Sequence, residues 1–589
     1  MSFFKKDFPF LFLISLILLI LQYSPYVYHL HQTPPDRVYL GAERYTPDYY
    51  IYLFYTNQGF LNRTTVSDFY TNVPHDDSFV HIEYLVMGKI GHLLGLSVVA
   101  AFYLFRSLFL IIYILTSFWF ITKFIKDTLW QKLTLILSFF YGGLFWPEIT
   151  KTGLNLKAYF DFYQPPDLIN RLGFEPHKLI GMSLFLIILY LSYKTYKTYK
   201  TYIILFSLTL LAGLIHGITS ISLIFTIIFY LLLKVIIHIL NNKKPHLVGL
   251  LKSAKYYLFL AFLSLPLLYW QWVFSKNSAW QNASWWEHYF VQADFKSPLL
   301  PTLLGFLVVL GPLIFLSLLG LKQFLQKTQQ LGLLLLSFLS SNIFLFFLGF
   351  YFLETSKQRY FQTPYLLGWS ILAMYGLIDL IEKIRRRLTN FLRSPIPSER
   401  RGILTPQENL VNRHRKLLII TTTIILIFGL PNFKQGLDRE LYQFGKTPNL
   451  DLFSYPPKPW YESLVWAKDH TEANDVFLSL PNAGHVIPAI SGRRVFLGDF
   501  FHTPGYYDKL PFVTKFYGGQ MTKEEVKKIL SREHINYIFV GYEEKALGDI
   551  TKYQPGLFSE VFKNNEVVIY KVLKNFTKTS IQAKIVTIE

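Results

Sequence analysis

The residues of this sequence that are best suited to chemistry are acidic, and the first of them is Asp48, in the segment GAERYTPDYYIYLFYTNQG, Gly41 to Gly59. This segment follows the first long apolar run. A carboxylate there can take the proton of a hydroxyl group or bind a hard cation. The ring of Tyr49 beside it is suited to packing on a sugar ring or to lying at a lipid interface. An acid next to a membrane helix is also common as a solvated flanking residue, and this second interpretation stays open.

A second group of ionisable residues lies in the segment PEITKTGLNLKAYFDFYQPPDLINRLGFEPH, which separates two apolar runs. Its acids Glu148 and Asp161 offer oxygen ligands for a hard cation, and with His177 they form a set able to orient a phosphate group. We expect Asp48, Glu148 and Asp161 to be the ligands if the chemistry uses a divalent cation, Mg²⁺ or Mn²⁺. Tight ligand spacing is missing from the segment, so a reaction without metal stays open.

The composition indicates that most of the chain lies in a lipid bilayer. Of 589 residues, 52% are hydrophobic, 18% are aromatic and only 16% are charged, which is too apolar for a soluble protein of this length. The chain is therefore predicted to be an integral membrane protein. Its net charge of +20 does not require nucleic acid as a partner, because basic residues of membrane proteins gather in cytoplasmic loops. The sequence has no cysteine, which excludes disulfides and thiolate chemistry.

Apolar runs predict about eleven transmembrane helices. The predicted spans are 8–30, 98–122, 129–147, 178–193, two within 202–240, 256–275, 300–321, 331–353, 361–382 and 416–431. The tract 202–240 is divided at His216 and Gly217, because two spans keep the basic residues that follow it on the cytoplasmic side. Charge bias also places the N-terminus and the loop 383–416 in the cytoplasm. The polar segments that carry the acids then lie outside, together with everything after Pro431.

A short outer turn, LETSKQRYFQTP, carries Glu354, Lys357 and Arg359 between two predicted spans. Basic residues are disfavoured on this side of the membrane and so require an explanation. The planar guanidinium of Arg359 suits two-point binding of a lipid phosphate, and we expect Arg359 and Glu354 to bind substrate. The alternative is an ion pair between Glu354 and Arg359.

The composition from 432 to 589 is that of a soluble domain, which divides the chain into a membrane domain, 1–431, and an extracytoplasmic domain, 432–589. Strands are predicted at 476–481, 493–498 and 537–541, with a hairpin around Asn564. Helices are predicted at 459–470 and 521–534, the second beginning at Thr522 with acids in its first turn. This alternation predicts a mixed α/β fold with a parallel or mixed sheet.

These features together resemble the polytopic glycosyltransferase C superfamily. The resemblance covers nearly the whole chain, through the predicted bundle of about eleven spans, the outer loop with Asp48, the polar loop before the fourth span and the outer α/β domain. It implies transfer of a sugar, a hexose or a pentose, from a polyprenyl-phosphate or polyprenyl-diphosphate donor. It also implies that Asp48 is the catalytic base or a metal ligand.

The tail offers a further point of similarity. LPNAGHVIPAISGRRVFLGD, Leu480 to Asp499, has the layout of the segment in which oligosaccharyltransferase catalytic subunits carry a Trp-Trp-Asp-Tyr-Gly motif. Here Asn482 to His485 stands in that place without the tryptophans or the acid, which favours a lipid or glycan acceptor over a peptide. We expect a shaped surface loop from Gly484 to Asp499, with Gly484 and His485 contributing to acceptor binding.

The sequence therefore predicts an enzyme of the plasma membrane with a polyprenyl-linked donor, a lipid or glycan acceptor and membrane lipids as its partners. The alternative is a transporter or assembly protein for polyprenyl-linked glycans that performs no chemistry. Transporters place ionisable residues near the middle of their spans. Here the predicted spans are almost free of acids, and the acids gather outside, which favours the enzyme.

Overall fold

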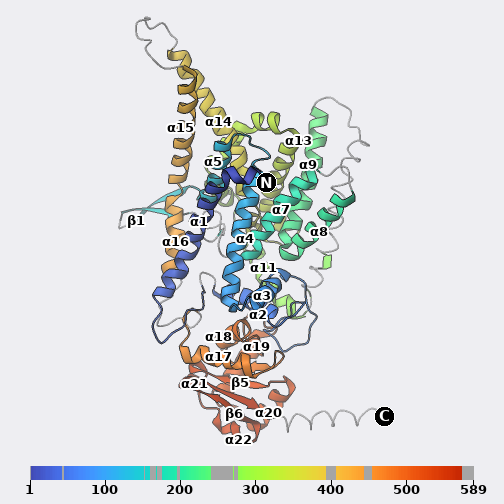
Figure 1. Ribbon diagram of the computed structural model, residues 1–589. Helices are drawn as coiled ribbons and strands as arrows, with labels where there is room; N and C mark the ends of the chain where they lie inside the picture. The colour runs from blue at the N-terminus through green and yellow to red at the C-terminus, as the bar shows by residue number, and fades with distance from the viewer. Residues whose placement is uncertain are drawn as a thin grey trace. The chain divides into compact units, whose positions relative to one another are not determined.

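The computed structural model describes residues 2–42, 46–150, 153–158, 168, 171, 175–194, 199–240, 269–270, 276, 278–392, 406–443 and 454–573. The chain forms two compact units (Figure 1). Unit 1 comprises 1–22, 106–268 and 287–439, and unit 2 comprises 23–105, 269–286 and 440–589. Unit 2 therefore combines the first polar segment of the chain with its C-terminal part.

Long apolar helices dominate unit 1. The helices that lie wholly or partly in it are α1 (Ser2–His31), α4 (Val98–Ile121), α5 (Thr128–Phe140), α7 (Pro176–Lys194), α8 (Tyr199–Ile215), α9 (Gly217–Leu240), α11 (Ser278–Lys296), α12 (Leu299–Leu310), α13 (Pro312–Leu348), the 3₁₀ turns η1 (Gly349–Tyr351) and η2 (Lys357–Gln362), α14 (Tyr365–Leu392), α15 (Pro406–Ile427), α16 (Leu430–Asp438) and the π-turn η3 (Arg439–Gln443). Six of the described helices are long and apolar enough to cross a membrane, or eight if each of two bent pairs counts as one span. The protein is thus an integral membrane protein.

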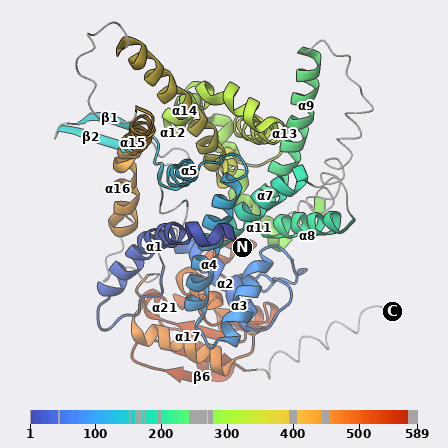
Figure 2. The same cartoon turned by 45° about the horizontal axis from the view of Figure 1, so that its top comes forward.

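The predicted spans agree with these helices in several places. The helices α1, α4 and α7 occupy the first, second and fourth predicted spans, and the break at His216 separates α8 from α9 as expected. The predicted span 256–275 lies almost wholly outside the described residues. The predicted third span, 129–147, is wrong beyond Phe140, because the chain turns there into a hairpin of β1 (Phe145–Thr150) and β2 (Gly153–Ala158). This hairpin projects beyond α16 (Figure 2).

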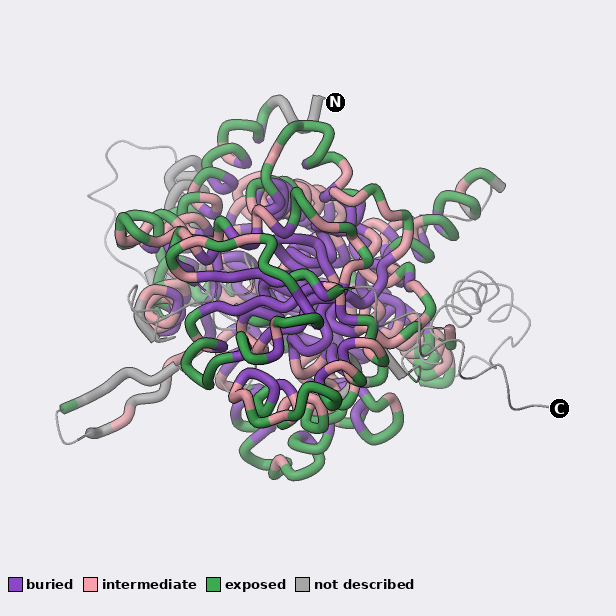
Figure 3. Tube along the Cα trace, turned by 90° about the horizontal axis from the view of Figure 1, so that it is seen from below, coloured by how far each residue is buried: buried purple, intermediate pink, exposed green. Residues whose placement is uncertain are grey.

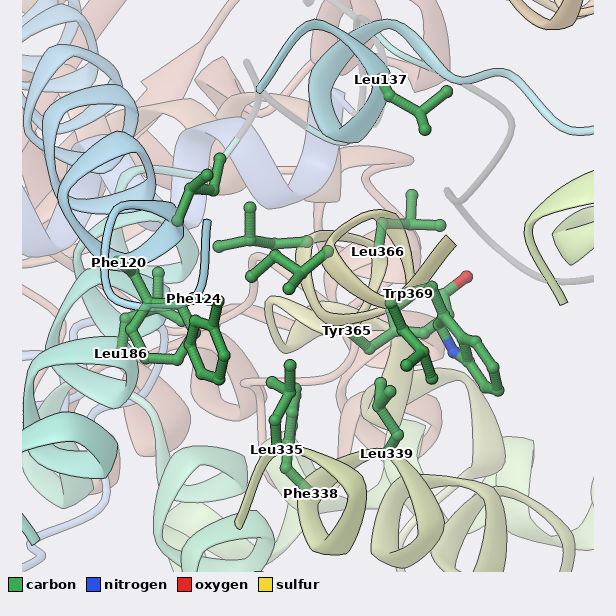
Figure 4. Close-up of a cluster of buried hydrophobic side chains, with 14 of the residues drawn as sticks. Phe120, Phe124, Leu137, Leu186, Leu335, Phe338, Leu339, Tyr365, Leu366 and Trp369 are labelled. Carbon is green, nitrogen blue, oxygen red and sulfur yellow. The ribbon is translucent and has the colours of Figure 1, made fainter. Parts of the chain in front are cut away.

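The core of unit 1 is built from interleaved side chains of its helices (Figure 4). Phe185 of α7 packs on Phe338 of α13, with ring centroids 4.7 Å apart. The helices α13 and α14 also meet backbone to backbone. A Cβ atom added to Gly376 would lie 1.7 Å from the carbonyl oxygen of Leu316, and one added to Gly320 would lie 2.2 Å from the amide nitrogen of Gly376. Small residues allow this close approach, which is a common way for helices to pack in lipid.

Unit 2 contains a mixed five-stranded sheet in the order β4-β3-β5-β7-β6. Its strands are β3 (Val476–Leu478), β4 (Arg494–Val495), β5 (Tyr537–Val540), β6 (Phe558–Lys563) and β7 (Val568–Val572), and its helices are α2 (Thr46–Phe60), α3 (Ile82–Leu93), α17 (Lys458–His470), α18 (Pro481–Ile490), α19 (Tyr506–Tyr517), α20 (Lys523–Arg532), α21 (Tyr542–Leu547) and α22 (Gln554–Leu557), with the 3₁₀ turn η4 (Thr551–Tyr553). The strands β3, β4 and β5 are parallel, whereas β6 and β7 form the expected antiparallel hairpin. The predicted mixed α/β fold is confirmed.

The start of α20 shows how local sequence determines an element. The Thr522 side chain accepts the N–H of Glu525, and the Glu525 carboxylate accepts the N–H of Thr522, which is a complete capping box.

The first polar segment of the chain packs into this α/β fold. The amide of Val495 donates to the carbonyl of Phe69, and Asn57 of α2 donates to the carbonyls of Ala489 and Ile490 at the end of α18. Residues Asn57 and Phe69 are both fully buried. Figure 3 shows the buried stretches of the chain in purple. The acids of the first polar segment are thereby brought beside residues of the C-terminal part.

Candidate active site

Asp48 lies in the first turn of α2, and its side chain is exposed. The N-terminal end of a helix carries partial positive charge, which favours the ionised form of a carboxylate. The next residue points the other way. Tyr49 is buried and donates its hydroxyl to the carbonyl of Leu40 over 2.7 Å, the placement of a core residue. Asp48 is thus an accessible carboxylate on a fixed helix end.

His485 contacts the residue that precedes Asp48. Its Nε2 donates to the carbonyl oxygen of Pro47 over 3.1 Å, because a carbonyl can only accept, and its Nδ1 lies 3.3 Å from Oδ2 of Asp499. The imidazole is 5% exposed and packs between the rings of Tyr50 and Tyr70, at centroid distances of 6.0 and 5.6 Å. Burial lowers the pKa of His485, while the charge of Asp499 opposes that shift.

A second buried pair of an acid and a histidine lies on the other side of Tyr70. Nδ1 of His502 is 3.4 Å from Oδ2 of Asp68, and the two rings of Tyr70 and His502 are 5.6 Å apart. Asp68 is fully buried, and its other oxygen accepts the N–H of Tyr70. The carboxylates of Asp68, Asp499 and Asp48 raise the pKa of His502 against the effect of burial. These carboxylates therefore favour a proton on His502.

One carboxylate connects the two pairs. Oδ1 of Asp499 accepts the N–H groups of Phe501 and His502, whereas its Oδ2 faces His485. Tyr70 completes the connection by donating its hydroxyl to the carbonyl of His485 over 3.0 Å. The pKa of Tyr70 is raised far above its usual value, mainly by burial and then by Asp499 and Asp68, so it remains a hydroxyl donor.

Unit 1 contains a small pocket of about 20 Å³ with a mixed polar and apolar lining. Its lining residues include Tyr113, Arg171, Lys178, Gln362, Thr363 and Tyr365. Lys178 is buried and ion-paired with Glu175, and Arg171 donates to the carbonyls of Tyr141 and Phe139. The buried hydroxyl of Tyr365 has no hydrogen-bond partner among the described residues. Two cations, hydroxyl groups and aromatic side chains therefore meet among apolar helices in this small pocket.

Arg359 is held by an acid of α11. Its Nε and Nη2 donate to Oε2 of Glu287 over 2.8 and 2.7 Å, and the other oxygen of Glu287 accepts the N–H of Ser356 over 2.6 Å. Glu354 is exposed, with a backbone φ of 49°. The turn thus has an ion pair that explains its basic residue, although the partner is Glu287, which the sequence did not indicate.

The structure describes two of the three predicted cation ligands. Asp48 belongs to unit 2, Glu148 pairs in register with Asn155 in the hairpin of unit 1, and Asp161 lies outside the described residues. His177 is buried with its Nε2 3.4 Å from Glu175. The cation set and the substrate contacts expected of His177, Tyr49, Glu354 and Arg359 remain predictions.

The expected surface loop from Gly484 to Asp499 is wrong over its first part. Residues 481–490 form α18, and those from Ala483 to Ile490 are buried. A Cβ on Gly484 would lie 2.0 Å from the carbonyl oxygen of Leu497, so this glycine allows α18 to lie against the segment that follows β4. Gly484 thus marks close backbone contact, which sequence patterns do not distinguish from a turn.

Sequence reasoning missed Asp68, Asp499 and His502 as members of this site. The only signal was the acidic character of the first polar segment, since no motif links residues so far apart in the chain. Reasoning from the spans also missed the ionisable residue Lys178 in the first turn of α7.

No family model matches the chain, and no curated protein does. Solved structures match over nearly its whole length. The oligosaccharyltransferase of Archaeoglobus fulgidus is 12% identical, with a TM-score of 0.48, over 98% of this chain and 76% of that protein. ArnT from Cupriavidus metallidurans bound to undecaprenyl phosphate is 11% identical, with a TM-score of 0.45, over 97% of this chain and 99% of that protein.

A mycobacterial arabinofuranosyltransferase, AftD, is 13% identical, with a TM-score of 0.44, over 96% of this chain and 40% of that protein. The chain is thus similar to these three proteins at 11 to 13% identity. Because every one of these TM-scores is below 0.5, the functional proposal depends on the residues of this chain.

Proposed function

We propose that the protein is a membrane glycosyltransferase that moves a sugar from a polyprenyl-phosphate or polyprenyl-diphosphate donor to a lipid or glycan acceptor on the extracytoplasmic side. The observation that carries this proposal is the exposed carboxylate of Asp48, placed at a helix N-terminus and backed by two buried pairs of an acid and a histidine. Such clusters of perturbed ionisable groups are typical of sites that perform chemistry.

In the proposed reaction, the acceptor hydroxyl attacks the anomeric carbon of the donor sugar. Asp48 takes the proton of that hydroxyl while the new C–O bond forms. The bond between the anomeric carbon and the phosphate oxygen breaks, and the phosphate leaves with the electron pair. Positive charge stabilises the growing charge of this phosphate. Within unit 1, we infer that Arg171 and Lys178 bind a lipid phosphate. A divalent cation, Mg²⁺ or Mn²⁺, would add further positive charge if it binds.

The proposal is tested with membranes that contain the protein and a donor with a radiolabelled sugar. We expect label to move to a lipid or glycan acceptor, and Asp48→Asn to lower the rate about 10²- to 10⁴-fold, because the amide keeps the shape but takes no proton. Glu560→Gln, at an exposed position of β6, is the matched control and should be fully active.

Two results would contradict the enzyme. If the Asp48→Asn variant transferred sugar at the wild-type rate, Asp48 would be only a solvated residue beside the membrane helix. Donor that crosses the membrane without losing its sugar would instead support the transporter.

A further inference from the structure

The contacts of His485 place it between the proposed base and the C-terminal part of unit 2. Its Nε2 donates to the carbonyl of Pro47, the residue before Asp48, and its Nδ1 faces Asp499. Asp499 is itself fixed by the N–H groups of Phe501 and His502. A continuous chain of contacts therefore leads from the turn after β4 to the beginning of α2.

This chain of contacts leaves little freedom at Pro47. Nε2 of His485 donates to a carbonyl oxygen, which can only accept, and its Nδ1 lies 3.3 Å from Oδ2 of Asp499. The ring is confined by Tyr50 and Tyr70, and the backbone carbonyl of His485 is held by the Tyr70 hydroxyl. The His485 imidazole is 5% exposed and is contacted on both faces and at both nitrogens, so it is suited to fixing the Pro47 carbonyl in place.

We propose that His485 is the positioning residue for Asp48, and that it acts through the Pro47 carbonyl with Asp499 as its anchor. The inference rests on the proposed function, because it assigns a purpose to the position of the base. It also changes the role that the sequence suggested for His485, from contact with the acceptor to control of Asp48. Displacement of a catalytic group by about 1 Å can cost about 10²-fold in rate, so this one hydrogen bond has a measurable effect.

The test compares His485→Leu with His485→Gln. Leucine fills the space but donates no hydrogen bond, whereas the glutamine amide nitrogen extends about as far as Nε2 and can donate to Pro47. We expect His485→Leu to lower kcat about 10- to 100-fold with little change in the KM of the acceptor, and His485→Gln to restore most of it. His470→Leu, an exposed histidine of α17, is the matched control and should leave kcat unchanged.

A double-mutant cycle separates positioning from general damage. If His485 acts through Asp48, adding His485→Leu to Asp48→Asn should cause no further loss, because there is no longer a base to position. If His485→Leu lowered kcat by the same factor in the Asp48→Asn background as in the wild type, the proposal would be overturned. A wild-type kcat for His485→Leu would also overturn it.

Hydrogen–deuterium exchange tests the same contact without any activity. The amides of α2 should exchange faster in His485→Leu and at the wild-type rate in His485→Gln. If the wild-type protein transfers no sugar, the proposed function fails, and exchange alone decides the inference. Unchanged exchange of α2 in His485→Leu overturns it, and faster exchange supports it.

Discussion

Glu544 shows what burial does to a single carboxyl group in unit 2. It is 1% exposed, and its two oxygens accept the N–H groups of Leu480 and Gly541 over 2.8 and 2.9 Å. Burial raises the pKa of Glu544 to about 7, above its ordinary 4.5, and the two hydrogen bonds oppose this shift only in part. The folded protein therefore binds this proton more tightly than the unfolded chain does.

The consequence is a contribution to stability that falls as the pH rises. Between pH 4.5 and about 7 the folded state holds more protons than the unfolded state, so the free energy of unfolding decreases through that window. We expect Glu544→Gln to flatten this part of the curve. The measurement is the Tm of the purified protein in detergent from pH 4.5 to 8. An unchanged slope in the variant would show that Glu544 does not titrate there.

The two cations of the pocket in unit 1 should affect the donor more than the acceptor. Replacing Lys178 or Arg171 by Gln removes a charge from the proposed phosphate site, and we expect the KM of the lipid donor to rise about tenfold or more. Lys434→Gln, an exposed cation of unit 1, is the control. Donor kinetics that match the wild type in both pocket variants would place the phosphate elsewhere.

At the scale of elements, two pairs of opposite charges fasten the turn between α13 and α14 to α11. Glu287 holds Arg359, and Asp294 lies 3.3 Å from the ammonium of Lys357 and accepts its backbone N–H over 2.7 Å. Removing one partner of such a pair leaves the other charge poorly compensated. The turn is thus a fixed part of the helix bundle.

A comparison of Arg359→Lys with Glu287→Gln distinguishes the two roles of Arg359. If Arg359 only fastens the turn, both variants should lower the Tm and change donor use to the same small extent. If it also binds the lipid phosphate, Arg359→Lys should raise the KM of the donor while Glu287→Gln does not. Wild-type stability in both variants would exclude the fastening role.

For the whole molecule, orientation in the membrane is the most consequential prediction. Because the chain has no cysteine, single cysteines can be introduced without removing others. We expect Glu560→Cys in unit 2 to react with a membrane-impermeant thiol reagent added outside intact cells, and Lys383→Cys near the end of the apolar part of α14 to react only after lysis. The reverse pattern would place Asp48 and the proposed chemistry in the cytoplasm.

The sequence predicted those parts of the molecule whose structure is determined by residues close together in the chain. The capping box of Thr522, the strands of the C-terminal sheet and the apolar helices α1, α4 and α7 all follow from neighbouring residues. The pairing of Asp68 with His502 could not be predicted, because it depends on how distant segments pack. Asp48 was identified by its place after the first span, whereas its support by His485 became visible only in three dimensions.

The glycine contact between α13 and α14 has a consequence for how the protein is made. The two helices are consecutive in the chain, so the ribosome delivers them to the membrane one after the other, and they can pair before the C-terminal part exists. Lipid supplies no hydrophobic drive for that pairing, which leaves close backbone contact to hold the helices together. The substitution Gly376→Ala would therefore act while the protein is being inserted. Its effect would be a smaller amount of protein in the membrane, because cellular quality control degrades chains whose helices do not pair.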